Sequence, residues 1–214
     1  MTDLWSWDRA FQAVPVLLEG FQITLLATAL GMVVAAILGL AIAISRRSQF
    51  RIIRWPVGAM NEFIRQTPLV VQLVFAYYLF TSISPLQIGI TVIGIHYATY
   101  MSEVYRAGID GVAPGQWEAT RALSMGPVRT WRAVILPQAI RSTLPALGNY
   151  AVSMFKETPF LFAISVVEMV TAAQQFGAQH FQYIEAITLA GLIFLIASYP
   201  TSLLIRKLET RLAY

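Results

Sequence analysis

Few side chains in this sequence have the types and spacing that chemistry requires. Its two histidines, His96 and His180, lie far apart, and neither has the second histidine four residues away that zinc hydrolases place on one helix. Neither the GxxxxGKS/T loop that cradles nucleotide phosphates nor the GxSxG turn around a nucleophilic serine occurs. There is no cysteine to hold a metal. We therefore predict a chain that is not an enzyme and binds no metal or cofactor.

Charged residues inside an apolar segment are the remaining candidates. The stretch KETP places Lys156 and Glu157 next to each other, so on a helix they point about 100° apart and do not face one another. Pro159 cannot donate to the carbonyl of Phe155, which predicts a kink. Two interpretations stay open: a polar site in a pathway, or a segment at the membrane interface from which Lys156 reaches water.

Composition identifies the environment of these groups. Hydrophobic residues make up 57% of the 214 residues and charged residues 12%, about half the charged fraction of a soluble domain. A membrane crossing takes roughly 20 apolar residues. The sequence predicts an all-α integral membrane protein, a single domain over 1–214, with five transmembrane helices at about 21–44, 68–83, 88–104, 147–170 and 187–205.

The basic residues predict the orientation of these spans. Lysine and arginine accumulate in short cytoplasmic loops, and here they follow the first, third and fifth spans, leaving only Arg9 on the opposite side. This asymmetry predicts an N-terminus outside and a C-terminus inside. Near the inner end of the third span, Glu103 is expected to pair with Arg106, three residues later on the helix. His96, within that span, is expected to be buried and hydrogen-bonded to a neighbour.

The interval between the third and fourth spans, about 106–141, is the most patterned polar segment. VAPGQWEATRALSM suits a short helix opened by Pro114, which Gly126 can end. A second helix can then open at Pro127, and we expect it to stop before Pro137. Small residues and an apolar face in register are unnecessary in a solvated tether, so the interval predicts a docking surface.

The same interval resembles the EAA signature of the membrane subunits of bacterial ATP-binding-cassette importers: EAA, three residues, Gly, nine residues, then IxLP. Here Glu118 and Ala119 are followed by Thr120 in place of the third residue, Ala, and Ser124 occupies the glycine position. The signature closes on Val134, Leu136 and Pro137, with Val in place of Ile. Because serine lacks the backbone freedom of glycine, we expect Gly126 to provide the turn.

The flanking segments resemble one subfamily, the polar amino-acid permeases. RQTPLVVQLVFAYY at 65–78 is similar to their RGTPLLVQLF, and YATYMSEVYRAGIDGVAPGQWEA at 97–119 to their AAYxAEIxRGGIxSVxxGQxEA. KETPFLFAISVVEM at 156–169 resembles KDTSLxxVIxxxEL, and LPQAIR at 136–141 matches outright. Four motifs in order over nearly the whole chain imply the type I importer permease fold.

The resemblance implies a permease in the bacterial inner membrane that works with three kinds of partner. These are a second permease, identical or homologous, two cytoplasmic ATPases that bind ATP and Mg²⁺, and an extracytoplasmic solute-binding protein. The resemblance also implies that the helix around Glu118 seats in a groove of the ATPase. The coupling residues would be Glu118, Ala119, Ala122, Leu123, Ser124, Gly126 and Pro137.

A polar amino acid or related zwitterion such as an ectoine is the implied solute. The polar groups of spans two to four that could face it are Gln72, Tyr77, Tyr78, His96, Tyr100, Lys156, Glu157 and Glu168, of which we select Gln72, Tyr100, Lys156 and Glu157. The alternative is an ion-coupled secondary transporter or a channel subunit, although the two halves of the chain show no internal repeat. Uptake that depends on ATP would distinguish the importer from these.

Overall fold

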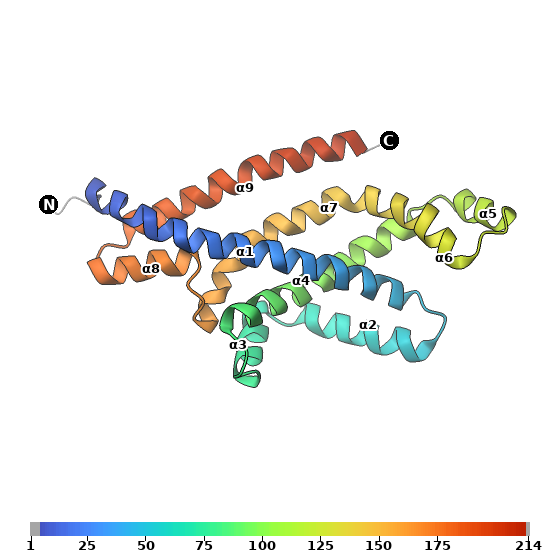
Figure 1. The fold of residues 1–214 in the computed structure, drawn as a ribbon, viewed down its shortest axis with the longest axis horizontal. Coiled ribbons are helices and arrows are strands. Elements are labelled where there is room, and N and C mark those ends of the chain that lie inside the picture. The colour runs from blue at the N-terminus through green and yellow to red at the C-terminus, as the bar shows by residue number, and fades with distance from the viewer. Residues whose placement is uncertain (1–4, 213–214) are drawn as a thin grey trace.

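The computed structural model describes residues 5–212, so the first four and last two residues of the predicted domain lie outside it. Every regular element over 5–212 is helical, as predicted (Figure 1). The α-helices are α1 (Trp7–Arg46), α2 (Arg51–Gln66), α3 (Leu69–Leu79), α4 (Pro85–Asp110), α5 (Pro114–Ala122), α6 (Pro127–Thr130), α7 (Leu136–Glu157), α8 (Met169–His180) and α9 (Ile184–Leu212). A π-helical turn, Trp131–Ile135, joins α6 to α7, and a 3₁₀ helix, Thr158–Ile164, follows α7.

A stripe of small residues lets α1 lie directly against α4. The buried positions of α1 recur every three or four residues and are mostly alanine and glycine, which is the spacing of one helix face. At the crossing, a Cβ on Gly94 would lie 2.6 Å from Cγ1 of Val34, and a Cβ on Gly39 would lie 3.0 Å from the Ala98 carbonyl oxygen. Larger side chains there would force the two backbones apart, so the small residues fix the central packing.

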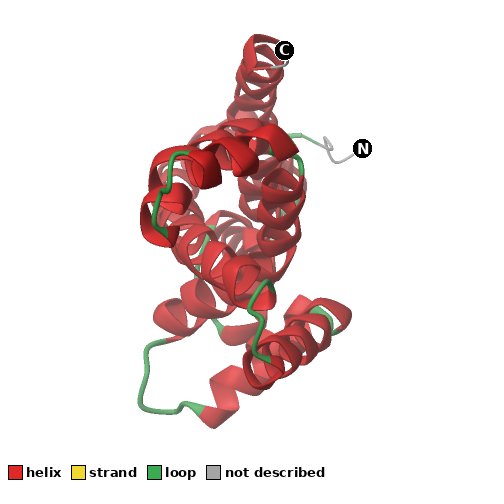
Figure 2. Cartoon of the chain, turned by 90° about the vertical axis from the view of Figure 1, so that its right-hand side faces the viewer, coloured by secondary structure: helices red, strands yellow, loops and turns green. Residues whose placement is uncertain are grey.

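The long helices run lengthwise and separate two ends of the molecule. Figure 1 shows α5 and α6 at one end, while the N-terminal part of α1 and α8 lie at the other. Figure 2 views the bundle from the α5 and α6 end, where the helices appear end-on and are joined by short loops. One buried cluster joins α1, α3, α4 and α7, and a second joins α1, α8 and α9. Residues from the interval that resembles the importer signature are therefore gathered at a single end.

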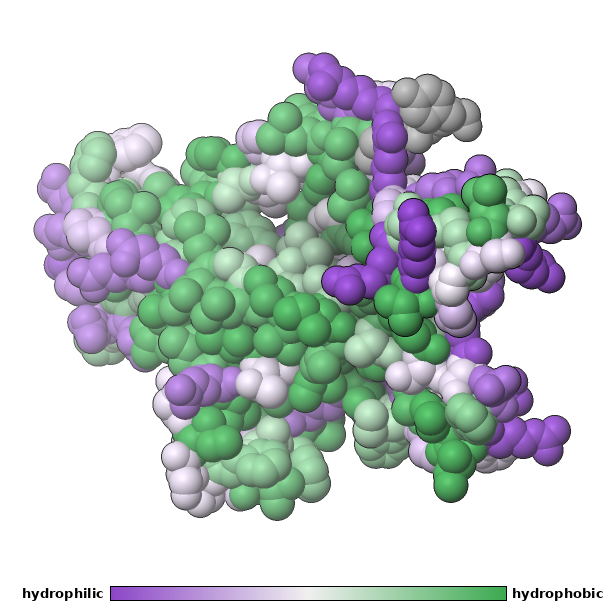
Figure 3. All heavy atoms as spheres, turned by 45° about the vertical axis from the view of Figure 1, so that its right-hand side comes forward, coloured by the Kyte–Doolittle hydropathy of each residue, from purple (hydrophilic) through white to green (hydrophobic). Residues whose placement is uncertain are grey.

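Two helices of the described part are long and apolar enough to cross a bilayer, Trp7–Arg46 and Ile184–Arg211. A third crossing is available if Pro127–Ile164 and Met169–His180, which are bent by 51°, act together. Apolar side chains cover the middle of the molecule in Figure 3, while hydrophilic ones gather on the right, at the end with α5 and α6, and in a smaller group on the left. The count of five crossings and their orientation stay predictions.

The fourth apolar segment, 147–170, is not one continuous helix. The α-helix ends at Glu157, the chain continues as a 3₁₀ helix, and α8 begins at Met169. Pro159 has no N–H for the Phe155 carbonyl, and the hydroxyl of Thr158 donates to that carbonyl instead, at 2.8 Å. The α-helix therefore ends two residues before Pro159, and the bend of 51° comes later, at the break between Ile164 and Met169.

Candidate functional site

The helix around Glu118 rests on a small apolar cluster of its own. Helix α5 opens at Pro114, as predicted. Trp117 packs edge-on against Trp131, with ring centroids 5.5 Å apart, over the buried side chains of Ile109, Val112, Ile135 and Ala139. Thr120, which departs from the signature, is buried, and its hydroxyl donates to the Trp117 carbonyl at 2.9 Å. The helix therefore has one face fixed to the bundle.

The opposite face of α5 is open. The side chain of Leu123 is 73% exposed. The signature residues on this face and in the following turn and helix are all exposed: Glu118, Ala119, Ala122, Leu123, Ser124, Gly126 and Pro137. The structure thus presents the predicted coupling residues at the surface, at one end of the molecule.

The turn after α5 is made by Ser124, contrary to our expectation for Gly126. Ser124 has φ 52°, in the left-handed region, whereas Gly126 has φ −65° and is extended. The amide of Met125 donates to the Thr120 carbonyl, and that of Ser124 to the Arg121 carbonyl, both at 2.9 Å. These two bonds form a Schellman motif, in which the residue after the cap must adopt positive φ. The position of the helix end therefore decides which residue adopts positive φ, and that residue is Ser124, not Gly126.

Ser124→Gly is therefore expected to stabilise the turn. Glycine removes the left-handed penalty of roughly 1 kcal/mol that serine experiences there, so we expect a higher unfolding temperature of the purified chain in detergent. Gly126→Ala is the matched control, because a Cβ at Gly126 meets nothing within 4 Å and its φ is negative. A stabilising Gly126→Ala with an unchanged Ser124→Gly would contradict this assignment.

The second helix of the interval opens at Pro127, as predicted, but does not stop before Pro137. Helices α6 and α7 are continuous through the π-helical turn Trp131–Ile135. The amide of Leu136 donates to the Trp131 carbonyl, five residues back. Pro137 then occupies the first turn of α7, where a missing N–H costs little. The exposed α5 face is thereby joined rigidly to the long helix α7.

Ion pairs tie the C-terminal ends of α1 and α4 together beside this surface. Glu103 pairs with Arg106 at 2.9 Å, as predicted, and also with Arg46 on α1. Asp110 likewise pairs with Arg47 of α1 and with Arg106. The hydrogen bond from Arg106 to the Glu103 carboxylate raises the pKa of this guanidinium above its usual range. These contacts hold the base of α5 at a fixed place on the bundle.

Deeper in the bundle, Gln72 of α3 and His96 of α4 form a polar pair. Nδ1 of His96 lies 3.1 Å from Oε1 of Gln72, which confirms the expected hydrogen bond of a buried histidine. The amide nitrogen of Gln72 donates to the Ile64 carbonyl at 2.7 Å and to the Thr67 hydroxyl at 2.7 Å. Gln72 therefore caps the end of α2 at the break before α3.

An aromatic group continues this polar pair across the bundle. The ring of His96 lies 5.3 Å from that of Tyr100, and Tyr150 of α7 lies 5.9 Å from Tyr100. Tyr97 packs on the same rings, and its hydroxyl interacts with the Glu157 carboxylate. The structure therefore brings three of the four selected residues, Gln72, Tyr100 and Glu157, into one group of contacts. The side chain of Lys156 is exposed.

A model of the family "Binding-protein-dependent transport system inner membrane component" matches residues 27–214. The chain belongs to this family. A probable amino-acid ABC transporter permease of Sinorhizobium fredii is 43% identical over 97% of this chain and 95% of its own length. The L-cystine transport system permease protein TcyB of Bacillus subtilis is 35% identical over 96% and 91%. The crystal structure of an amino acid ABC transporter with histidines matches with a TM-score of 0.88, 31% identity, and coverage of 99% of this chain and 100% of that one.

The chain is thus the inner-membrane permease component of a binding-protein-dependent amino-acid ABC transporter, and it is a non-catalytic subunit. The predicted family, fold type, function and location are confirmed. Membership implies ATPase and solute-binding-protein partners. No ectoine transporter is among these relatives, so the ectoine alternative finds no support in them.

Sequence reasoning missed several residues of the permease's polar group. Helix α2 was not predicted, because its charged and apolar residues average to low hydropathy. It carries the pair Glu62 and Arg65, 2.8 Å apart, and the Arg65 carbonyl accepts a hydrogen bond from Tyr100 at 3.4 Å. Glu62 and Arg65 are opposite charges three residues apart in an amphipathic segment, and this pattern could have predicted helix α2 from the sequence.

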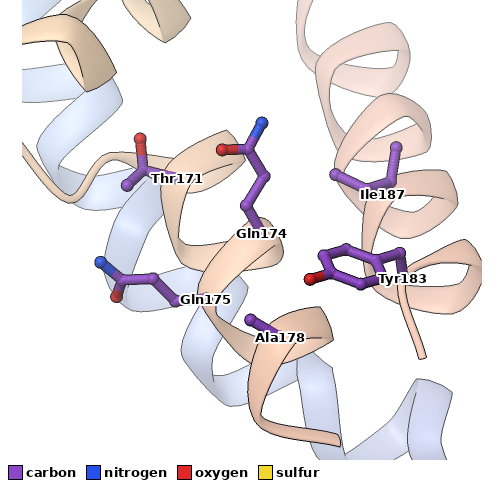
Figure 4. A pocket seen from close by; sticks show the side chains of 6 residues that line it. All are labelled: Thr171, Gln174, Gln175, Ala178, Tyr183 and Ile187. Carbon is purple, nitrogen blue, oxygen red and sulfur yellow. The ribbon is translucent and has the colours of Figure 1, made fainter. Parts of the chain in front are cut away.

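At the end of the permease away from α5, a hollow of about 530 Å³ lies between α8 and the start of α9. Figure 4 shows Gln174 and Gln175 projecting from α8, with Tyr183 and Ile187 on the other side. Glu168, a wider pathway candidate, lies buried at the first turn of α8, where its carboxylate accepts from the amides of Val170 and Thr171. It is a helix cap and is not open to a solute.

Proposed function

We propose that this permease pairs with a second permease to enclose a pathway for a polar amino acid, crossing the inner membrane five times with its N-terminus outside. The single observation that supports translocation best is the group Gln72, His96, Tyr100 and Glu157, because polar groups held inside an apolar helical bundle usually serve a pathway. One chain exposes this group only in part. A partner permease is needed to close a polar pathway.

The two ends of the permease have different partners in this proposal. Two ATPase subunits, which bind the ATP and Mg²⁺, hold the two permeases, and the exposed face of α5 in each permease seats in the groove of one ATPase, with Glu118 and Leu123 in contact with it. The solute-binding protein docks at the opposite end, where Gln174, Gln175 and Tyr183 are exposed (Figure 4). ATP hydrolysis on one side and solute delivery on the other are then linked through the long helices.

The solute is a polar amino acid with free ammonium and carboxylate groups. Glu157 supplies a carboxylate for the ammonium group, and the tyrosines supply hydroxyls and ring faces. Two of the relatives named above are amino-acid permeases, one of them for L-cystine, which agrees with this solute class. Lys156, adjacent but exposed, is the candidate for the solute carboxylate.

The test is uptake by the reconstituted transporter. A panel of basic, acidic and amide amino acids, L-cystine and an ectoine is offered with and without ATP. Glu157→Gln is expected to raise the KM for the best solute about tenfold, because a hydrogen bond to a charged group contributes roughly 1.5 kcal/mol or more. Glu19→Gln, an exposed acid on α1, is the control. Uptake that does not depend on ATP would contradict the proposal, and so would equal KM values for Glu157→Gln and Glu19→Gln.

A further inference from the structure

Helix α2 has a polar face that packs against α4. Around the helix, Asn61 and Arg65 lie about 40° apart, since each residue advances by about 100°. The exposed side chains of Ile52 and Phe63 lie on the opposite side. Asn61 is 2% exposed, and its Oδ1 accepts a hydrogen bond from the hydroxyl of Ser102 on α4 at 3.1 Å. Figure 1 shows α2 ending near α3, so this polar face reaches the middle of the bundle.

Arg65, in the last turn of α2, contacts the polar group inside the bundle. Its carbonyl oxygen accepts a hydrogen bond from the hydroxyl of Tyr100 at 3.4 Å. The charge of its guanidinium also interacts with this hydroxyl and with the carboxylate of Glu103. Tyr100 lies about 15 Å from the end of α4 at Asp110, since a helix rises about 1.5 Å per residue. The positive charge of Arg65 therefore lies inside the apolar length of the bundle, where charged residues usually serve a function.

Glu62 uses only part of the Arg65 guanidinium. Nη2 of Arg65 donates to Oε1 of Glu62 at 2.9 Å and to Oε2 at 2.8 Å. Nε and Nη1 donate to no atom within residues 5–212, and the side chain is 30% exposed. A guanidinium carries N–H donors on all three of its nitrogens. Two nitrogens of Arg65 therefore keep donors for a second acceptor.

The ion pairs around Arg65 leave one positive charge in excess. They join four arginines of α1, α2 and α4 to three acids, namely Arg46, Arg47, Arg65 and Arg106 to Glu62, Glu103 and Asp110. An uncompensated cation inside an apolar bundle is costly unless it gains a partner. The excess charge therefore favours the binding of an anion beside these residues.

The amino acid that the permease is proposed to carry has such an anion, its carboxylate. Both oxygens of a carboxylate accept hydrogen bonds, so one carboxylate can bind a guanidinium and a hydroxyl together. We propose that Arg65 and the Tyr100 hydroxyl bind the carboxylate of the transported amino acid, from the α2 side of the polar group. This inference rests on the proposed function, because it takes the group of Gln72, Tyr100 and Glu157 as part of the pathway. Glu62 competes for the same guanidinium, which limits the affinity and allows release.

The test uses the full permease, purified in mild detergent with the subunits that accompany it and without the solute-binding protein. Binding of L-cystine, L-arginine, L-glutamine and L-glutamate is measured by equilibrium dialysis, and so is binding of the α-amide of each, which lacks the carboxylate. Arg65→Gln is expected to raise the Kd of the amino acids about tenfold, the loss expected for a hydrogen bond to a charged group. The Kd of the α-amides should change far less, because they carry no charge for Arg65 to bind.

Glu62→Gln is the matched variant, and its expected effect is opposite. It removes the acid that competes for Arg65, so the Kd of the amino acids should fall. Arg65→Lys keeps the charge with fewer donors and should recover part of the affinity, which also shows that the chain still folds. Arg206→Gln removes a charge from an exposed position of α9 and should leave the Kd unchanged.

Three outcomes would overturn the inference. The first is an equal rise in the Kd of the amino acids and of their α-amides in Arg65→Gln. The second is a rise in Glu62→Gln as large as that in Arg65→Gln, and either result would give the ion pair a structural role. The third is an unchanged Kd in Arg65→Gln with a raised Kd in Glu157→Gln, which would leave the proposed function standing without Arg65. A wild type that binds none of the four amino acids would contradict the proposed solute class, and this inference with it.

Discussion

Replacing Leu123 with aspartate is expected to abolish co-purification of the ATPase subunits and solute-stimulated ATP hydrolysis. Leu123 is 73% exposed at the end of α5, on a helix whose opposite face is fixed by Trp117 and Trp131. An apolar anchor in the centre of a helix-in-groove contact commonly contributes 2 kcal/mol or more, which corresponds to at least about thirtyfold in affinity. A carboxylate at that place would also be buried without a partner.

Glu118→Lys is expected to weaken the same association, because it reverses a charge at the exposed face of α5. Both variants should insert and fold normally, since neither side chain packs against the bundle. Leu123→Met, which keeps an apolar side chain of similar volume, and Glu209→Lys, a reversal on exposed α9, are the controls. Unchanged ATPase recovery with Leu123→Asp would mean that α5 is not the docking helix.

The helices that hydropathy describes were predictable, and so were the starts of α5 and α6 at their prolines, but α2 was not. Helices α1 and α9 are apolar over a long stretch, so composition alone located them. Helix α2 was not predicted because its charged residues lower its mean hydropathy, although they occupy only part of its surface. These residues are Arg51, Arg54, Glu62 and Arg65. A window average cannot separate an amphipathic helix from a loop of the same composition.

Local backbone geometry depended on contacts that the sequence does not show. Pro137 is normally a stop signal, yet the π-helical turn before it places the proline in a first turn, where it is tolerated. Gly126 was the expected turn residue, but the register of the Schellman bonds from Ser124 and Met125 decided the position. Both errors arose from judging a residue by its type before the helix end was known.

The exposed surface around Glu118 was easier to predict than the polar group inside the bundle. The signature around Glu118 lies within one short segment, so the spacing of its residues can be read directly from the sequence. The polar group of Gln72, Tyr100 and Glu157 is assembled from α3, α4 and α7, and its members are brought together only by packing. Glu168 was included among its candidates on residue type alone, and its burial gives it a different role.

Glu168→Ala is expected to have the largest effect on stability of any substitution described above. The carboxylate of Glu168 is fully buried at the break between the 3₁₀ helix and α8. It accepts from the Val170 amide at 3.0 Å, from the Thr171 amide at 2.7 Å and from the Thr171 hydroxyl at 3.0 Å. Alanine would leave two amides and one hydroxyl, all part-buried, without their acceptor at a cost of about 1 kcal/mol each, so a loss of roughly 3 kcal/mol is expected.

The position of α8 against α1 depends on the same carboxylate. A Cβ on Gly20 would lie 2.8 Å from Cα of Met169, so α1 approaches the start of α8 closely, and the Thr24 hydroxyl lies 3.5 Å from Glu168. The measurement is thermal unfolding of the purified permease in detergent. Glu185→Ala is the matched control: Glu185 is also buried but accepts one hydrogen bond within residues 5–212, from the Ser6 amide at 2.8 Å, so its loss should be about a third as large. Equal losses in both variants would mean that burial of an acid, and not the capping of α8, determines the effect.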